Sequence, residues 1–405
     1  MKILLLCNKS PYPALEGGPM AMNSIVTGLL DAGHQVKILA VNSKKYNVTI
    51  DDIPEDYRQK TGIELIDVDL RVKPFKAFTN LFSKKSYHVE RFISKDFTNR
   101  LIEVLQHDVY DVVQLETLFM TPYVETIRQH SKALVVLRAH NVEHLIWERI
   151  AKGTRFFLKR AYINHLARTL KNYELSAISQ VDGIAAITRK DAAFFRKYSA
   201  TTTIDIPYGV YPDEFVPNYE IEDKPSFYHI GSMNWIPNEE GIRWFIENCM
   251  DAVTAKVPDF VFHLAGRNMP EWLKEMKNPH VDVVGEVPNA KEFVANHDIA
   301  IVPLLSGSGI RIKIIESMAL GKAVITTMVG AEGILYDEDI NIIIADNKAQ
   351  MAEAIRRFNE NPALAVEVGK AARKLVEEVY DNRKLTERLL LFYSQIKPTS
   401  RITFV

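Results

Sequence analysis

Short apolar runs alternate with amphipathic stretches along the whole of this chain. An apolar run of four to eight residues between turn signals is typical of a strand that is buried on both faces, as in a parallel sheet. The strands predicted in this way are 2–7, 36–41, 63–70, 112–116, 134–139, 183–187 and 203–206, and then 227–230, 260–265, 281–284, 299–304, 323–327 and 342–345. Apolar positions at helical spacing predict helices over 20–32, 92–106, 161–179, 239–249, 291–295, 312–320, 348–359 and 363–380.

Each half of the chain repeats the strand–helix alternation of a Rossmann-like unit. The two halves join near Ile206-Pro207-Tyr208-Gly209-Val210, and the polar stretch that follows, up to Pro225, is typical of a linker. We therefore predict an α/β protein with two doubly wound domains facing a cleft, at 1–207 and 208–384. An amphipathic segment at 385–395 is expected to cross back, so that 385–405 packs on the first domain.

Length and composition agree with a two-domain globular protein. The chain has 405 residues, of which 47% are hydrophobic and 25% charged, and no apolar run reaches 18 residues. The opening MKILLLC is too short for a secretory signal and predicts a first buried strand. The two cysteines, Cys7 and Cys249, fall in buried elements of different halves, which favours a reducing, cytoplasmic location without a disulfide framework.

The formal net charge of −1 conceals an asymmetry between the halves. Residues 1–200 carry 29 Lys and Arg against 21 Asp and Glu, and the remainder carries 21 against 30. The basic excess gathers in 149–171, which has seven cations, no acid and interleaved aromatic residues. Such a stretch is a candidate for peripheral contact with an anionic membrane or for a phosphate-bearing acceptor, and a solvated helix face is the alternative.

The segment 301–321, IVPLLSGSGIRIKIIESMALG, holds the strongest chemical signal. A strand runs into a Gly-Ser-Gly loop, and the next helix opens with Arg311 and Lys313, where the helix dipole disfavours cations by roughly 0.3–1 kcal/mol each. An anion held on the free N–H groups near Gly309 would reverse that cost. We therefore predict a phosphate site here, with Glu316 one turn further along and able to accept two hydrogen bonds from a ribose diol.

Other candidates follow the ends of predicted strands, where open α/β sheets bind their ligands. Gly17-Gly18 follows the first strand and either approaches a ligand or forms a plain turn. His140 ends a strand of the same half and is either a packed polar residue or a ligand contact, as is Glu116. Asn141, next to His140, is able to cap the helix that follows, with Glu143 in its first turn.

The first strand of the second half is followed by Gly231 and then by Asn238, Glu239 and Glu240, which predict an ordinary acidic helix start. No Lys or Arg occurs within 225–242. The charge that neutralises a phosphate at Gly231 must therefore come from elsewhere, and Arg311 and Lys313 are the nearest candidates. No His/Cys/Asp cluster with metal-ligand spacing is evident, so we expect no metal requirement.

These residues together resemble a known family, the retaining, nucleotide-sugar-dependent glycosyltransferases of family 4 (glycosyl transferases group 1), which have the GT-B fold. The resemblance covers nearly the whole chain and is carried most specifically by residues 306–327 and by Gly330-Ala331-Glu332-Gly333. Weaker support comes from Gly17-Gly18, Arg138-Ala139-His140-Asn141, IPYGV at 206–210, GSMNWIPN at 231–238, LAG at 264–266 and GEVPN at 285–289.

The resemblance implies a role for each matching position. Arg311 and Lys313 would bind the donor diphosphate and, with His140 near the anomeric carbon, form the catalytic set. Glu316 would hold the ribose. The remaining donor contacts would be Gly17, Gly18, Gly231, the backbone at Val287, Gly307, Ser308 and Gly309. The chain departs from the family pattern at Ser308, where the first acid of a glutamate pair is expected, and lacks a basic pair after the first strand of the second half; the resemblance is to members with Gly-Ser-Gly-Ile-Arg-Ile-Lys here.

The function expected from the residues and the resemblance is transfer of a hexose from a UDP- or GDP-sugar to an acceptor hydroxyl, with retention. The acceptor would be a saccharide or a lipid-linked saccharide of cell-surface polysaccharide or glycolipid assembly, at the inner membrane face. No other cofactor and no nucleic acid are expected. Two alternatives remain open: a non-catalytic subunit that binds a sugar nucleotide, motivated by Ser308, and a nucleotide-sugar epimerase. A dinucleotide oxidoreductase is disfavoured because no G-x-G-x-x-G follows a strand.

Overall fold

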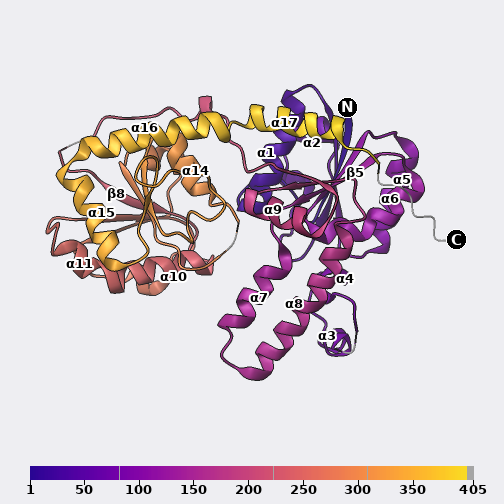
Figure 1. Ribbon diagram of the computed structural model, residues 1–405, viewed down its shortest axis with the longest axis horizontal. Helices are drawn as coiled ribbons and strands as arrows, with labels where there is room; N and C mark the ends of the chain where they lie inside the picture. The colour runs from indigo at the N-terminus through magenta and orange to yellow at the C-terminus, as the bar shows by residue number, and fades with distance from the viewer. Residues whose placement is uncertain (82, 222, 308, 399–405) are drawn as a thin grey trace. The chain divides into compact units, whose positions relative to one another are not determined.

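The computed structural model describes residues 1–398 except 82, 222 and 308. For residues 77 and 78 it describes the backbone but not the side chains. The chain divides into two compact units (Figure 1). Unit 1 comprises Met1–Tyr208 and the chain from Asn382 onward, and unit 2 comprises Gly209–Asp381. Each unit is built on its own parallel sheet, so the α/β, two-domain fold predicted from the sequence is confirmed.

The sheet of unit 1 has seven parallel strands in the order β3-β2-β1-β4-β5-β6-β7 within the described residues. Its strands are β1 (Lys2–Cys7), β2 (Gln35–Asn42), β3 (Glu64–Asp67), β4 (Val112–Glu116), β5 (Leu134–Ala139), β6 (Gly183–Ala186) and β7 (Thr202–Asp205). The order reverses between β1 and β4, which are paired with Ile3 opposite Val112. This reversal is the topological switch point, where ligands bind in doubly wound folds.

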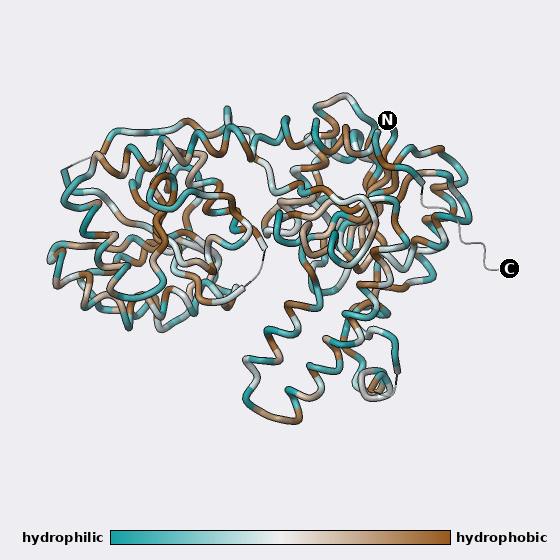
Figure 2. The backbone as a smooth tube through the Cα atoms, in the orientation of Figure 1, coloured by the Kyte–Doolittle hydropathy of each residue, from teal (hydrophilic) through white to brown (hydrophobic). Residues whose placement is uncertain are grey.

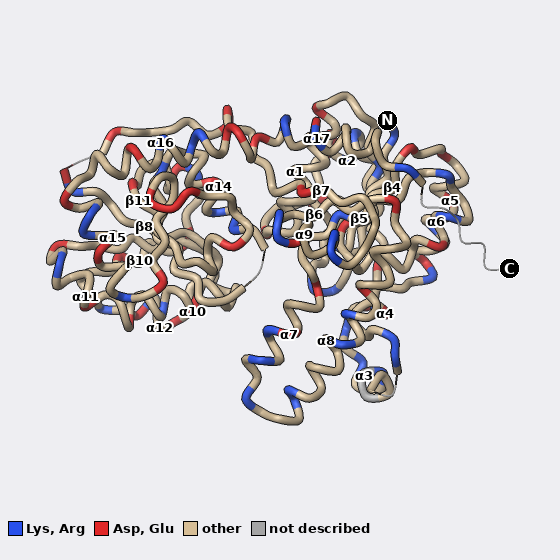
Figure 3. Tube along the Cα trace, in the orientation of Figure 1, with Lys and Arg blue, Asp and Glu red and all other residues tan. Residues whose placement is uncertain are grey.

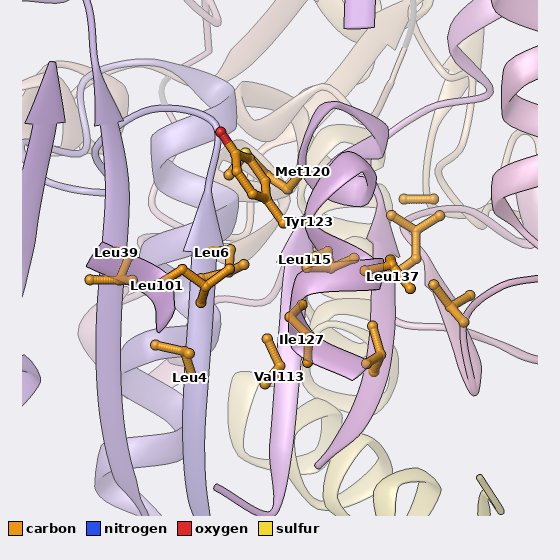
Figure 4. Close-up of a cluster of buried hydrophobic side chains, with 14 of the residues drawn as sticks. Leu4, Leu6, Leu39, Leu101, Val113, Leu115, Met120, Tyr123, Ile127 and Leu137 are labelled. Carbon is orange, nitrogen blue, oxygen red and sulfur yellow. The ribbon is translucent and has the colours of Figure 1, made fainter. Parts of the chain in front are cut away.

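Helices cover both faces of this sheet, and the two-residue period of β1 decides which side chains meet them. Leu4 and Leu6 pack with α5 (Lys95–His107), α6 (Val124–His130) and α9 (Arg189–Tyr198), a cluster that also contains Leu39, Leu115 and Leu137 (Figure 4). Ile3, Leu5 and Cys7 pack on the opposite face with α1 (Gly17–Asp31), α2 (Glu55–Thr61) and α17 (Asn382–Gln395). Helix α17, the last within the described residues, therefore completes the core of unit 1.

The remaining helices of unit 1 lie toward one edge of its body. They are α3 (Pro74–Asn80), α4 (Tyr87–Glu90), α7 (Glu143–Gly153) and α8 (Phe157–Ala177), with 3-10 turns at Ile50–Asp52 and Leu118–Tyr123. Figure 1 shows α7 and α8 as an antiparallel hairpin that extends beyond the sheet, with α3 beside it. Among the described residues, no helix is long and apolar enough to cross a membrane.

The sheet of unit 2 has six parallel strands in the described residues, in the order β10-β9-β8-β11-β12-β13. Its strands are β8 (Phe227–Ile230), β9 (Phe262–Ala265), β10 (Val281–Gly285), β11 (Ile299–Val302), β12 (Ala323–Thr326) and β13 (Ile343–Ile344). The switch point lies between β8 and β11. Figure 2 shows the most hydrophobic segments of both units running through these central strands, as expected of sheets buried on two faces.

The helices of unit 2 follow its strands in alternation. They are α10 (Ile236–Trp244), a π-helix (Phe245–Cys249), α11 (Met250–Thr254), α12 (Glu271–Lys274), α13 (Ala290–Ala295), α14 (Ile312–Ala319), α15 (Lys348–Glu360) and α16 (Pro362–Val379), with a 3-10 turn at Pro212–Glu214. One face of the sheet packs against α10, α11 and α15 through Ile242, Val253 and Ile355. Cys249 in unit 2 and Cys7 in unit 1 are both buried free thiols.

Helix starts differ from the predictions at several candidate residues. Helix α1 begins at Gly17, so the Gly17-Gly18 pair forms its first turn instead of preceding it. Helix α10 begins at Ile236, which places Asn238 inside it. Asn141 does not cap α7, because the Glu174 carboxylate of α8 accepts hydrogen bonds from the backbone N–H groups of Glu143 (2.9 Å) and His144 (3.2 Å). A long-range carboxylate thus takes the place of the local cap.

Candidate functional site

Two loops of unit 2 leave the carboxyl ends of β8 and β11, the strands on either side of the switch point. The first contains Gly231 and leads into α10, and the second contains Gly307 and Gly309 and leads into α14. Doubly wound sheets bind ligands at this position because the diverging connections leave a crevice there. The residues predicted from the 301–321 segment therefore lie where the fold alone would place a ligand.

Lys313, in the first turn of α14, is a half-buried lysine whose ammonium contacts neutral partners. It donates to Asn238 Oδ1 at 2.8 Å and lies 3.2 Å from Nε2 of His229. His229 donates its Nδ1 proton to the Ile301 carbonyl at 2.8 Å, so Nε2 is free to accept from the ammonium. No ion pair to Lys313 occurs among the residues that the structure describes.

The pKa values of Lys313 and His229 are those expected of an ammonium that has no negative charge close to it in the described structure. Burial and, to a smaller extent, the nearby Arg311 charge lower the pKa of Lys313 to about 7. Burial and the charge of Lys313 also hold the pKa of His229 well below its usual range, so its imidazole is neutral near pH 7. A bound phosphate would supply the missing negative charge and restore the charged form of Lys313.

Gly231 lets the backbone approach the ammonium closely. A Cβ at this position would lie 2.3 Å from Lys313 Nζ and 2.8 Å from Nδ2 of Asn238. The backbone of Gly231 also lies close to Gly266: a Cβ on Gly266 would come within 1.8 Å of the Gly231 carbonyl oxygen. Any larger residue at 231 would therefore push the lysine away.

Arg311 is the N-cap residue of α14, and its side chain folds back over the glycine loop. Its Nη1 donates to the Gly309 carbonyl at 2.8 Å, and its guanidinium lies 5.4 Å from the ring centroid of Trp235. Gly307 and Gly309 have φ values of 111° and 79°, in the region that favours glycine. A Cβ on Gly307 would lie 3.0 Å from Arg311 Nη2 and 3.2 Å from the Trp235 ring.

Glu316 lies one turn further along α14, in a largely desolvated position. Burial raises the pKa of its carboxyl to about 7, and the attraction of Lys291 opposes this shift. Within the described part of the chain, no side-chain hydrogen bond to this carboxylate is found. The carboxylate is thus available to accept hydrogen bonds from a ligand.

His140 of unit 1 follows β5 and is held by a buried ion pair. Its Nε2 lies 2.7 Å from Oε2 of Glu116, and Nη1 of Arg138 lies 3.3 Å from the same oxygen. Burial raises the pKa of Glu116, but the Arg138 charge and the His140 bond outweigh it and leave the pKa lowered. The Glu116 carboxylate is therefore ionised, and Nε2 of His140 must carry the proton that it shares with it.

The tautomer of His140 determines what it can offer. Burial is the main reason why the pKa of His140 is lowered, and Arg138 and Lys9 lower it further against the raising effect of Glu116. A neutral ring with its proton on Nε2 has an acceptor lone pair on Nδ1. The network continues below the ring, where Gln114 donates to Glu116 at 2.6 Å and Tyr393 of α17 donates to Gln114.

The Gly17-Gly18 pair lies at the N-terminus of α1, whose first turn contains no acid. A Cβ on Gly18 would lie 3.0 Å from Cε of Lys9, the residue that follows β1 by two positions. Lys9 pairs with Glu16 at 3.0 Å and lies 4.4 Å from the ring centroid of Tyr46. Since Lys9 also lowers the pKa of His140, the first-turn glycines, this lysine and the histidine share one region of unit 1.

The structure brings some of the predicted residues together and not others. Gly231 meets Lys313, and Gly307 and Gly309 meet Arg311. Val287 is half-buried in the loop between β10 and α13, and among the described residues no side-chain hydrogen bond or ion pair joins it to the others. Ser308 lies outside the described residues.

Sequence reasoning did not assign His229, Asn238, Trp235 or Lys9 to the site. A signal existed for His229, since a polar residue in the otherwise apolar strand FYHI requires a partner. Asn238 was assigned to a helix start, whereas its side chain bridges the Ser232 carbonyl (2.8 Å) and Lys313. Across the described residues, no group of three or more His, Cys, Asp and Glu is placed to hold a metal ion.

Two Rossmann-like units in one chain, with a cationic glycine loop at the second switch point, define the GT-B class of fold. Comparison with known proteins agrees: residues 224–361 match the sequence profile described as glycosyl transferases group 1. An uncharacterised 44.6 kDa protein of the cps region of Klebsiella pneumoniae is 21% identical over 393 residues, covering 95% of this chain and 97% of that protein.

Solved structures share the fold over nearly their whole length. HepE of Anabaena, solved in complex with UDP, superposes with a TM-score of 0.67 at 12% identity, over 97% of this chain and 100% of that one. Sucrose-phosphate synthase from Thermosynechococcus elongatus gives 0.69 at 16% identity, over 98% and 99%. The profile match and the shared fold together support a glycosyltransferase.

Proposed function

We propose that this protein transfers a hexosyl unit from a UDP- or GDP-sugar to an acceptor hydroxyl, with retention at the anomeric carbon. The observation that carries the proposal is the half-buried Lys313 at the switch point of unit 2, whose largely desolvated ammonium lies against Asn238 and His229 with its pKa lowered to about 7. A buried cation without a counter-charge is destabilising unless a ligand supplies one. The diphosphate of a sugar nucleotide is a ligand of the required charge.

The geometry of the second loop supports the same ligand. The diphosphate would lie against the N-terminus of α14, where the backbone N–H groups and the helix dipole favour an anion. Arg311, stacked near Trp235, would bind a second phosphate oxygen, and Gly307 and Gly309 would allow the backbone to approach. Glu316 would accept hydrogen bonds from the two ribose hydroxyls. The base would be read by the backbone at Val287.

These groups would stabilise the charge that develops during transfer. The bond between the anomeric carbon and the diphosphate oxygen breaks, and the electron pair stays with the diphosphate beside Lys313 and Arg311. The acceptor hydroxyl forms the new bond on the same face of the sugar, and its proton passes to a departing phosphate oxygen. Side-chain cations would do the work of a metal ion, so we propose that no metal and no further cofactor is required.

His140 would contact the transferred sugar. Its neutral ring, with Nε2 bonded to Glu116, presents Nδ1 as an acceptor for a sugar hydroxyl. Gly17 and Gly18 would contribute backbone N–H groups in the first turn of α1. The acceptor is proposed to be a saccharide or lipid-linked saccharide in the assembly of a cell-surface glycan, handled in the cytoplasm.

The test is a donor screen with the purified full-length chain. Binding of UDP and GDP is measured by calorimetry, and turnover of matching sugar nucleotides is followed by nuclear magnetic resonance, which reports the anomeric configuration of the product. Replacing Arg311 by Ala should lower turnover by about 10²–10³-fold while the circular dichroism spectrum stays unchanged. Binding without transfer or hydrolysis would indicate a non-catalytic subunit, and conversion of the donor without an acceptor would indicate an epimerase.

A further inference from the structure

Helices α7 and α8 form a hairpin whose base is fixed and whose tip is open to solvent. At the base, the Glu174 carboxylate binds the first two N–H groups of α7 and the His144 ring, the latter at 2.5 Å. The ring of His88 of α4 lies tilted against that of Trp147, with ring centroids 4.0 Å apart. Figure 1 shows that the hairpin then continues away from the sheet of unit 1. Its direction is thus set by a packed, polar base.

The tip of the hairpin exposes large apolar side chains. Around the turn between the two helices, Phe156, Phe157 and Leu158 are 60%, 64% and 58% exposed, and Ile150 is 44% exposed. The two phenylalanine rings lie next to each other, with centroids 5.6 Å apart. Single exposed apolar residues are normal on a protein surface, but a contiguous group on a projecting turn marks a contact site.

Cations surround this apolar tip. The segment 149–171 holds seven of them and no acid, and most are exposed: Arg149, Lys152, Arg155, Lys159, Arg160, Arg168 and Lys171. Figure 3 shows these cations along both arms of the hairpin and around its turn. Lys171, the furthest from the tip, is 3.9 Å from Glu148. The tip therefore combines an apolar end with a positively charged collar.

A second basic surface lies beside α8. The His165 ring contacts the carbonyl of Asn80, the last residue of α3, at 3.1 Å. A pocket of about 630 Å³ opens here, and its five cations outnumber the acids Asp69 and Glu90. Those cations are Arg71, Lys73, Lys76, Lys85 and Arg91. Phe75 of α3 is 79% exposed. The pattern of the tip, cations next to an exposed aromatic ring, is thus repeated about 12 Å back along α8.

We propose that the α7–α8 tip inserts Phe156, Phe157 and Leu158 into the interface of an anionic lipid bilayer, while the surrounding cations bind the phosphates of the headgroups. Aromatic and aliphatic side chains partition into the interface, and each Lys or Arg near an acidic surface adds about 1 kcal/mol, or roughly fivefold in affinity. The alternatives fit less well. A second copy in a twofold contact would set this cationic collar against itself, and a soluble polyanion would leave the apolar tip unused.

The surface lies wholly within unit 1, so the inference does not depend on the donor site assigned to unit 2. The experiment is co-sedimentation of the full-length chain with vesicles, without any sugar nucleotide. One set of vesicles contains phosphatidylcholine alone, and the other also contains roughly 30–50% phosphatidylglycerol, which gives a strongly negative surface potential. We expect binding to the acidic vesicles only, and loss of that binding as salt screens the cations. Calorimetry with UDP on the same samples reports the donor site separately.

Two sets of variants divide the surface into its parts. Phe156→Ser with Phe157→Ser should weaken vesicle binding by roughly tenfold or more, and Val109→Ser with Val216→Ser, at positions 89% and 77% exposed, is the matched control that should not. Lys152→Gln, Arg155→Gln and Lys159→Gln together should weaken it by about 100-fold, whereas Lys44→Gln, Lys45→Gln and Lys132→Gln, which remove the same charge from exposed sites elsewhere, should have a much smaller effect.

Four outcomes would overturn the proposal. They are equal binding to neutral vesicles, no binding to acidic ones, equal effects of the tip variants and their controls, and a change of oligomeric state in the Phe156→Ser/Phe157→Ser variant without lipid. The last would mean that the tip joins copies of this chain, and light scattering on the same samples detects it. UDP binding that persists in every variant would show that the donor site is unaffected.

Discussion

Replacing Lys313 by Met should strongly lower turnover and, in the same protein, raise the melting temperature. The substitution keeps an unbranched side chain of similar length and removes the ammonium that we assign to the donor diphosphate. Loss of one charge-stabilising donor from a preorganised site typically lowers the rate by about 10²–10³-fold. UDP binding should weaken as well, because a charge-assisted hydrogen bond contributes about 1.5–3 kcal/mol.

The gain in stability follows from the desolvation of the Lys313 ammonium. Its pKa falls from 10.5 to about 7, which corresponds to roughly 4 kcal/mol of destabilisation at pH 7 relative to an exposed lysine. Methionine removes that term, but leaves Asn238 Oδ1 without its donor, at a cost of about 1–3 kcal/mol. The net gain is about 1–3 kcal/mol, or roughly 2–10 °C for a unit of this size.

The assay is a thermal melt of the ligand-free protein together with calorimetric titration of UDP. Lys322→Met is the matched control, since Lys322 is a buried lysine of unit 2 whose pKa is also lowered. It differs in position, because it follows the C-terminal end of α14 and donates to the Ala295 carbonyl at 2.9 Å. This control should retain UDP binding and turnover. A Lys313→Met protein that melts lower than wild type, or that still binds UDP with unchanged affinity, would refute the reasoning.

Two further predictions concern protons and the buried ion pair. Because Lys313 must be charged to bind a diphosphate and its pKa is about 7 in the free protein, its contribution to UDP affinity should fall by up to about tenfold per pH unit above pH 7. Calorimetry between pH 7 and 8.5 on wild type and on the Lys313→Met protein isolates this contribution, and a Lys313→Met protein with the same pH dependence as wild type would contradict it. In unit 1, Glu116→Gln should lower stability by about 3–5 kcal/mol, since it leaves the Arg138 charge buried and unpaired. Adding Arg138→Met should recover most of that loss in a urea titration, and a double variant no more stable than the single one would show that the pair is not the cause.

Local patterns in the sequence determined the elements of the fold. The bounds of β1, β4, β5 and β8 agree with the predicted strands residue for residue, because each is a short, mostly apolar segment buried on both faces of its sheet. The cations at the start of α14 were recognisable for a similar reason: their position relative to the helix dipole is fixed by the chain itself.

Tertiary contacts decided which groups meet, and the sequence alone did not reveal them. Lys313 reaches Asn238 and His229 across 75 and 84 residues, and His140 reaches Glu116 across 24, through the order of strands at each switch point. Tertiary contacts also explain why Asn141 does not cap α7. The carboxylate of Glu174, from α8, accepts the hydrogen bond of the first backbone N–H group of α7 instead. Side chains brought together by sheet order have no fixed spacing in the chain. The sequence therefore determined the strands and the charged helix start, whereas the tertiary structure decided the partners that set the pKa of each site residue.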